Sequence, residues 1–292
     1  MKILAALDGS DCSRAVIDHC LKCKWSSEDQ FKLISVVDFF EPLPALEGLK
    51  KKEIDSARQL LESETARLMK TFPQLNVSYR VLDGYVKTQV VDEARDWGAD
   101  LILLGSHGRT GLKRLLLGSV STAVLYHSGR TVRIVRPAEN ASESGYFDVF
   151  LPMDDSKFSL HSLERLLSYS WPENVRFTLM SVVFPLPEAP DAPDSQRFQL
   201  EDRKKKLKEE AVHLLESAKA RIEDKLSVKS ETKLVVVLGN ARDEILKYLE
   251  EHPPELVIMG SHGRGAFDQA LMGSVSDAVV NHAGCSVEIV RL

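Results

Sequence analysis

A glycine-rich pattern, G-x2-G-x9-G-S, occurs twice in this sequence of 292 residues, at residues 105–119 and 260–274. In both copies the first glycine follows a short apolar run, and the closing Gly-Ser opens a segment with helical character. Glycines let a backbone adopt positive φ and approach a ligand closely, so successive N–H groups can point at one anion. A helix start adds unpaired N–H groups and the positive end of its dipole. The pattern therefore predicts two phosphate-binding loops that need no catalytic side chain.

The residues expected to contact phosphate are these glycines and the first residues of each following helix, whose serine hydroxyls can add donors. They are Gly105, Gly108, Gly118, Ser119, Val120 and Ser121 in the first copy, and Gly260, Gly263, Gly273, Ser274, Val275 and Ser276 in the second. Ordinary turns and helix caps use the same residue types, and the repetition at identical spacing favours the ligand-binding interpretation. Neither G-x4-G-K-[ST] nor a helix-opening G-x-G-x-x-G occurs.

Histidine and arginine side chains also lie within the pattern. His107 and His262 have no carboxylate or second histidine nearby at a metal-binding spacing, so a loop-supporting or ligand-stacking role is expected rather than metal binding. Arg109 and Arg264 follow the second glycine, where they either screen phosphate charge or lie exposed.

The sequence repeats well beyond this pattern. Residues 105–136 align without gaps to residues 260–291, and 18 of the 32 aligned pairs are identical. The repeat continues upstream at a different offset, where Trp25 matches Trp171. Two similar domains are therefore predicted. They span residues 1–137 and 147–292 and are joined by a polar linker, residues 138–146.

Within each copy, short β-branched runs alternate with longer amphipathic segments, which is typical of βαβ units around a parallel sheet. In the first copy strands are expected near residues 3–7, 31–37, 77–82, 101–104 and 132–135, and helices near 12–22, 49–70, 87–97 and 119–127. The second copy repeats this scheme with a long charged helix near residues 199–225. Its lysine-rich run is followed by glutamates, so we interpret it as a solvated helix face.

On these residues the chain resembles the universal stress protein family, and in particular its ATP-binding branch, whose signature is G-x2-G-x9-G-[ST]. The resemblance covers nearly the whole chain, twice. It implies two tandem five-stranded α/β domains of the adenine nucleotide alpha hydrolase-like type, each with strand order 3-2-1-4-5. In such a sheet the ends of strands one and four flank the point where open α/β sheets bind ligands.

The resemblance also implies the roles of individual residues. Asp8 and Asp154, at the end of strand one, would read the adenine or its neighbourhood, while Val37 and Val183 would contact the base. A helix N-cap or turn carboxylate is the alternative for Asp8. Asp155 stands in the second copy where the first has Gly9, and we expect it to add negative charge near the phosphates of the second site.

Composition limits the other classes of function. The net charge of −5 and pI near 6.0 argue against a nucleic-acid-binding chain. The apolar runs are too short to cross a membrane, and no secretory signal is evident, so a cytoplasmic location is expected. Cys20 and Cys23 form a C-x-x-C, but the apolar residues around them recur at helical spacing. We therefore expect a helix that faces the core.

The leading hypothesis is a stress-response regulator that binds ATP, or ADP or AMP, with Mg²⁺ left open as an accompanying ion. Slow ATP hydrolysis or phosphate transfer is the enzymatic alternative, although no general base or arranged metal site is evident in the sequence. A third hypothesis is a pseudo-dimeric interaction scaffold whose nucleotide sites are relics. Because the last strands, near residues 132–135 and 287–290, would each lie at a sheet edge, we expect the two domains to pack there as a pseudo-two-fold dimer. Association of two chains into a homodimer is left open.

Overall fold

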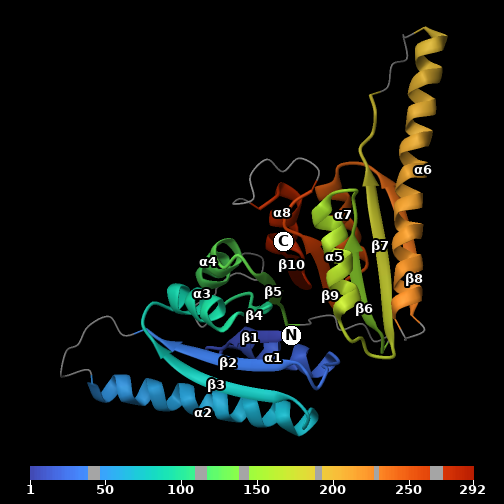
Figure 1. The fold of residues 1–292 in the computed structure, drawn as a ribbon. Coiled ribbons are helices and arrows are strands. Elements are labelled where there is room, and N and C mark those ends of the chain that lie inside the picture. Colours follow the sequence, from blue (N-terminus) through green and yellow to red (C-terminus); the bar gives the residue numbers. More distant parts are fainter. Residues whose placement is uncertain (39–46, 109–116, 138–144, 188–192, 227–229, 264–271) are drawn as a thin grey trace.

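The computed structural model describes residues 1–38, 47–108, 117–137, 145–187, 193–226, 230–263 and 272–292. In this part of the chain ten strands form one sheet, and eight helices cover it (Figure 1). The first half contributes β1 (Lys2–Ala6), α1 (Asp11–Lys22), β2 (Gln30–Val37), α2 (Glu47–Thr71), β3 (Asn76–Asp83), α3 (Val86–Trp97), β4 (Leu101–Gly105), α4 (Ser119–His127) and β5 (Thr131–Val135). The second half contributes β6 (Phe147–Pro152), α5 (Lys157–Ser168), β7 (Val175–Val183), α6 (Asp194–Lys225), β8 (Glu231–Leu238), α7 (Ala241–Glu251), β9 (Leu256–Gly260), α8 (Ser274–His282) and β10 (Ser286–Val290).

Helix α1 shows why these segments fold as the periodicity predicts. The Ser10 side chain caps the helix by accepting a hydrogen bond from the Ser13 N–H, which satisfies one of the free donors of a helix start. Its inward face is apolar and includes Val16 and the buried Cys20. The cysteines of the described residues are free thiols, and burial raises the pKa of Cys20. The expectation of a helix that faces the core is confirmed.

Each half of the sheet has the strand order that the family resemblance implied. The order is β3-β2-β1-β4-β5 in the first half and β8-β7-β6-β9-β10 in the second, with parallel pairing throughout each half. The central strands β1 and β4 pair from Ile3 and Leu101 to Ala6 and Leu104. Parallel strands end at a common edge, so the segments that follow β1 and β4 lie side by side there.

The two halves join through β5 and β10, which pair antiparallel with Arg133 opposite Glu288. On one face of the sheet a single apolar core spans both halves and includes Val132, Ile134, Val287 and Ile289. On the other face, α1 and α2 cover one separate core and α5 and α6 cover another. The shared core makes the β5–β10 boundary part of the buried interior rather than a sheet edge.

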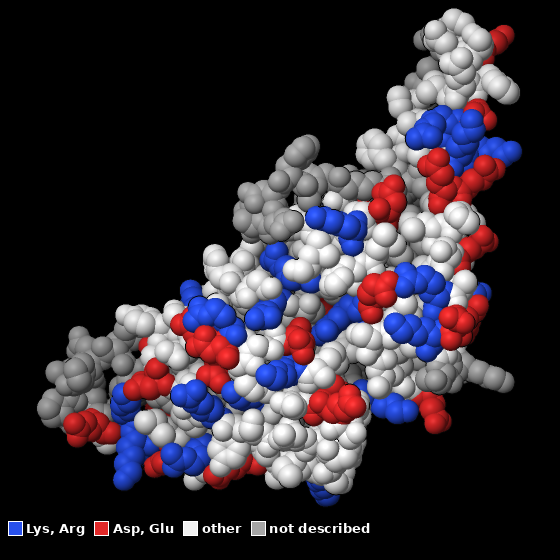
Figure 2. Space-filling view, viewed as in Figure 1, with Lys and Arg blue, Asp and Glu red and all other residues white. Residues whose placement is uncertain are grey.

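Helix α6 extends beyond the sheet (Figure 1). Ion pairs such as Lys206 with Asp202 and Lys204 with Glu201 run along it, which confirms that its lysine-rich run is a solvated helix face. Figure 2 shows Lys and Arg interspersed with Asp and Glu over the visible face of the molecule. Among the described helices, none is both long enough and apolar enough to span a bilayer.

Candidate functional site

The carboxylate of Asp8 is fixed immediately after β1. Its Oδ1 accepts hydrogen bonds from the Ser10 backbone N–H at 2.9 Å and from the Ser10 hydroxyl at 2.6 Å. Ser10, rather than Asp8, is the N-cap of α1. Asp8 therefore forms a turn with Ser10 and keeps its second carboxylate oxygen turned toward the loop that follows β4.

That loop comes very close to Asp8 at Gly108. A Cβ placed on Gly108 would lie 2.7 Å from Asp8 Oδ2, which is far inside van der Waals contact. The loop can pass the carboxylate only because residue 108 has no side chain. The structure thus brings together two of the predicted site residues that are 100 positions apart in the sequence.

Gly105, at the end of β4, is required for a different reason. A Cβ there would lie 2.8 Å from the backbone carbonyl carbon and oxygen of Cys12 in α1, so the glycine allows α1 to pack directly against the strand end. The expectation that the loop glycines adopt positive φ is wrong, because none of Gly105, Gly108 and Gly118 does so. Close approach of backbone and carboxylate, rather than an unusual dihedral angle, accounts for these glycines.

Gly118 is the N-cap of α4 and has an extended backbone with φ −64°. No side chain caps this helix start, in contrast to α1, where the Ser10 hydroxyl does so. A Cβ on Gly118 would lie 3.4 Å from the His107 Cα and the Ser106 carbonyl oxygen. The first turn of α4, which has no side-chain cap from its own N-cap residue, therefore lies beside Gly108 with N–H groups of the kind that bind anions.

The remaining residues predicted at the site differ in their exposure and in their hydrogen bonds. Ser119 is exposed and Val120 is half-buried. The Ser121 hydroxyl donates to the Gly105 carbonyl oxygen at 2.7 Å and is buried, so the hydroxyl of this residue ties α4 to the end of β4. Val37, at the end of β2, is buried and lies three residues beyond the partner of Ala6.

The second half repeats this geometry. Asp154 Oδ1 accepts from the Ser156 N–H at 3.1 Å and the Ser156 hydroxyl at 2.5 Å, and a Cβ on Gly263 would lie 2.9 Å from Asp154 Oδ2. The other equivalent residues also match. Gly260 packs against the backbone of Phe158, the N-cap Gly273 has φ −65° and no side-chain cap, and Ser276 donates to the Gly260 carbonyl oxygen at 2.7 Å. Val183 is buried at the end of β7, Ser274 is exposed and Val275 is half-buried.

The two sites differ where the first copy has Gly9. Gly9 has φ +80°, in the left-handed region, whereas its counterpart Asp155 is an exposed residue without positive φ. A second difference lies in the helix that follows each loop, because the first turn of α8 contains Asp277 where α4 has Thr122. Both differences give the second domain an aspartate where the first domain has an uncharged residue.

The two histidines contact their own loops. His107 Nδ1 lies 3.1 Å from the Ser106 hydroxyl, and His262 Nδ1 lies 2.9 Å from the Ser261 hydroxyl. The His262 ring also packs on Phe158 at a centroid distance of 4.9 Å. These contacts favour the loop-supporting interpretation. Arg109 and Arg264 lie outside the described residues.

Ser10 and Ser156 are contributors that the sequence analysis did not identify. Each orients the site aspartate two residues before it and caps the following helix. The signal was present, because Asp-x-Ser occurs at the same place in both copies.

A hollow of about 930 Å³ lies between the two halves, apart from these sites. It is lined by residues of α1 and α7 and of the segments that follow β5, α7 and α8, including Arg136, Glu255 and Cys285. None of the predicted nucleotide-site residues lines it. The candidate sites are therefore separate from this hollow.

Comparison with known proteins shows the family of this chain. The model of the universal stress protein family matches residues 1–136 and 145–291. The chain therefore belongs to the universal stress protein family.

Similar proteins fall into two groups by length. Universal stress protein A homolog 2 of Coxiella burnetii is 34% identical and covers 46% of this chain and 94% of its own length. Universal stress protein Mb2019 of Mycobacterium bovis is 24% identical and covers 99% of this chain and 95% of its own length. A solved universal stress protein structure from Archaeoglobus fulgidus, 18% identical, covers 99% of this chain and 98% of its own with a TM-score of 0.67, which shows the same fold over the whole length.

Proposed function

We propose that this chain is a stress-response regulator that binds one adenine nucleotide in each of two domains, residues 1–137 and 147–292. The observation that carries the proposal is the pair of helix starts at Gly118 and Gly273. Neither has a side-chain cap from its own N-cap residue, and each lies near a loop glycine that closely approaches an aspartate carboxylate. Free N–H groups and the positive end of the helix dipole favour a phosphate at such a position.

The carboxylates have a different role from the helix starts. Asp8 and Asp154 are negatively charged, so they would repel a phosphate in direct contact. They suit a hydrogen-bond donor of the nucleoside, such as a ribose hydroxyl or the adenine amino group, or a Mg²⁺ ion shared with the phosphates. Mg²⁺ commonly binds through one or two carboxylates and substrate phosphates, so a single aspartate in each domain fits that role.

The sites lie on a scaffold that can link them. Both domains contribute to one sheet and one shared core, and we infer that in solution the chain is a pseudo-dimer joined through β5 and β10. A nucleotide bound at the N-terminus of α4 would act on this helix, whose Tyr126 hydroxyl donates to Asp277 in the first turn of α8. This contact supports a regulator in which the state of one site affects the other.

The test is to identify the nucleotide that copurifies with the chain. Protein denatured with acid and analysed by ion-exchange chromatography should release adenine nucleotide, approaching two molecules per chain after incubation with ATP, ADP or AMP and removal of free ligand. Release of no adenine nucleotide under any of these conditions would refute the proposal. Turnover of ATP by the same sample, lost on Gly118→Val substitution, would support the slow ATPase instead.

A further inference from the structure

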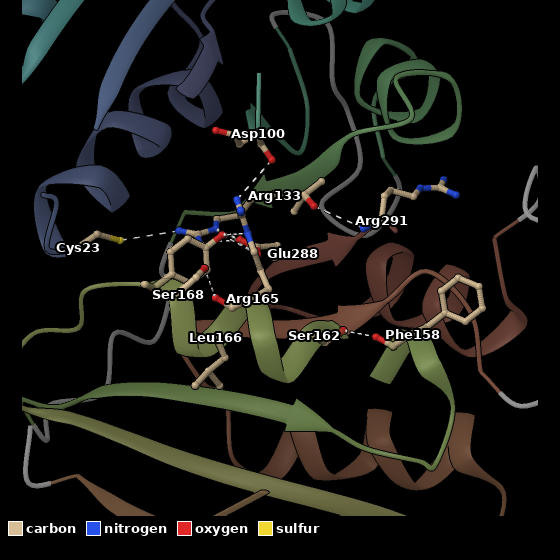
Figure 3. A network of polar contacts seen from close by, with 12 residues as sticks. Cys23, Asp100, Arg133, Phe158, Ser162, Arg165, Leu166, Ser168, Glu288 and Arg291 are labelled. Carbon is tan, nitrogen blue, oxygen red and sulfur yellow. Dashed lines mark hydrogen bonds and ion pairs between the residues drawn. The ribbon is translucent and has the colours of Figure 1, made fainter. Parts of the chain in front are cut away.

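The centre of the boundary between the two domains is a buried pair of opposite charges. Arg133 on β5 lies directly opposite Glu288 on β10. Its Nε and Nη2 lie 2.7 and 2.6 Å from Glu288 Oε2, and the side chains are 2% and 0% exposed. Figure 3 shows the two side chains meeting between the strands.

These two residues occupy the same position in the repeat. Alignment of residues 105–136 with 260–291 matches Arg133 to Glu288. The flanking pairs, Ile134 with Val287 and Val132 with Ile289, are arranged symmetrically around them. The pseudo-two-fold axis that relates the domains therefore passes between Arg133 and Glu288, and any residue at this position would face its own copy in a pair of identical domains.

Two arginine contacts across the boundary are alike on both sides. Arg136 donates to the Val280 carbonyl oxygen at 2.6 Å, and its counterpart Arg291 donates to the Leu125 carbonyl oxygen at 3.0 Å. The two acceptors are also equivalent residues, at the C-terminal ends of α8 and α4. Such contacts would form equally well between two copies of one domain, so they cannot select the partner.

The charge pair does distinguish between partners. Two first domains in this register would place Arg133 against Arg133, and two second domains would place Glu288 against Glu288. Like charges directly opposite in a strand pair are destabilising, and a buried charge without a counter-ion is costly. Only the pairing of a first with a second domain gives each charge its partner.

The groups around the pair also differ between the two domains, in keeping with the charge that each domain carries there. On the first domain's side, His19 Nε2 lies 3.0 Å from Arg133 Nη1, and the Cys23 thiol accepts from it at 3.9 Å. Burial, followed by the charges of Arg133 and Lys22, holds the pKa of His19 well below its usual range, and burial raises the pKa of Cys23. Both groups are neutral near pH 7, so the first domain supplies no anion for Arg133.

On the second domain's side, the Tyr169 hydroxyl donates to Glu288 Oε1 at 2.7 Å, and Arg165 Nε lies 3.6 Å from the same oxygen. His19 and Cys23 match Arg165 and Tyr169 in the repeat. Because Arg165 offers Glu288 a second cation, the barrier to self-pairing is higher for the first domain than for the second.

We propose that Arg133 and Glu288 form a selectivity pair, which makes the edge strand of the first domain accept only an edge strand with a carboxylate at this position and reject a second copy of itself. The partner is the second domain, in the same chain or in another copy.

The experiment uses two full-length charge-reversal variants, Arg133→Glu and Glu288→Arg, studied separately and as an equimolar mixture. Each variant alone has like charges at the axis, so small-angle scattering should show a larger radius of gyration than wild type. In the mixture, each first domain can find an opposite charge on the other chain, and light scattering should show a complex of twice the chain mass. The cis double variant Arg133→Glu/Glu288→Arg should regain the compact single-chain profile. Arg14→Glu, which reverses an exposed charge on α1, is the control that should scatter as wild type does.

Two results would overturn the proposal. If either single reversal scatters as wild type does, the pair does not select the partner. If both single variants open or misfold, and neither the mixture nor the cis double variant recovers the compact pairing, the residues are needed for folding rather than for selection.

Discussion

Asp8 and Gly108 are so close that a Cβ on the glycine would lie 2.7 Å from the Asp8 Oδ2 atom. The contact joins the end of β1 to the loop after β4, the two segments that open α/β sheets use to bind ligands. The same relation holds between Asp154 and Gly263, at 2.9 Å. The carboxylate and the loop therefore act as one unit in each domain.

Gly108→Ala is expected to displace the Asp8 carboxylate and weaken nucleotide binding at the first site about tenfold, which corresponds to about 1.4 kcal/mol. Stability should change little, because the displaced group is the end of a half-buried side chain. Affinity is measured by calorimetric titration and stability by urea unfolding. Gly48→Ala, on α2, is the control because a Cβ there meets no atom within 4 Å. If Gly108→Ala leaves the nucleotide affinity unchanged, the position of the Asp8 carboxylate does not matter for binding, which contradicts the prediction.

Asp8→Ala should weaken nucleotide binding more than it lowers the free energy of unfolding. The α1 cap is the Ser10 hydroxyl, so removing Asp8 leaves the cap residue in place and costs only its turn hydrogen bonds, about 1 kcal/mol. Asp8→Asn retains an acceptor for Ser10 and isolates the effect of the charge. A loss of stability in Asp8→Ala without any loss of affinity would assign the carboxylate to the turn alone.

Stability should fall as pH drops below about 6.5, and His19 should contribute to the fall. Burial keeps its folded-state pKa well below the usual range, whereas the imidazole of the unfolded chain takes up a proton near pH 6.5. The unfolded state then binds more protons, so each pH unit below that value costs about 1.4 kcal/mol until the folded-state pKa is reached. Urea unfolding at pH 7 and pH 5.5 should therefore show a smaller difference for His19→Gln than for wild type. The exposed His161 provides the control, and His161→Gln should behave as wild type does; an equal pH dependence in all three proteins would contradict the assignment.

The fold follows closely from the sequence because local pattern and packing agree. The predicted helix at residues 119–127 is α4 without any change in bounds, and the other strands and helices of the first half differ by one or two residues at their ends. Helix α6 starts at Asp194, five residues before its expected start, because its first turns are exposed and carry no apolar face that would mark them. Strand order came from the family resemblance rather than from periodicity.

The site was predictable only in part. The glycine spacing identified the loops, but not what each glycine approaches, because the backbone of Cys12 and the carboxylate of Asp8 come near only after folding. The Arg133–Glu288 pair was not predicted for the same reason, because its two residues meet only in the folded chain. The repeat alignment showed opposite charges at equivalent positions, but only the antiparallel register of β5 and β10 places them face to face.

Calorimetric titration of the full-length chain with ATP, together with Gly118→Val and Gly273→Val, tests the central claim most directly. Each substitution places a branched side chain where the Cβ alone would already lie within 3.4 Å of backbone atoms that follow β4 or β9, and so fills the space that a phosphate needs. We predict two sites per chain in the wild type, one in each single variant, and none in the double variant. Binding of ATP with wild-type stoichiometry and affinity in the double variant would contradict the account.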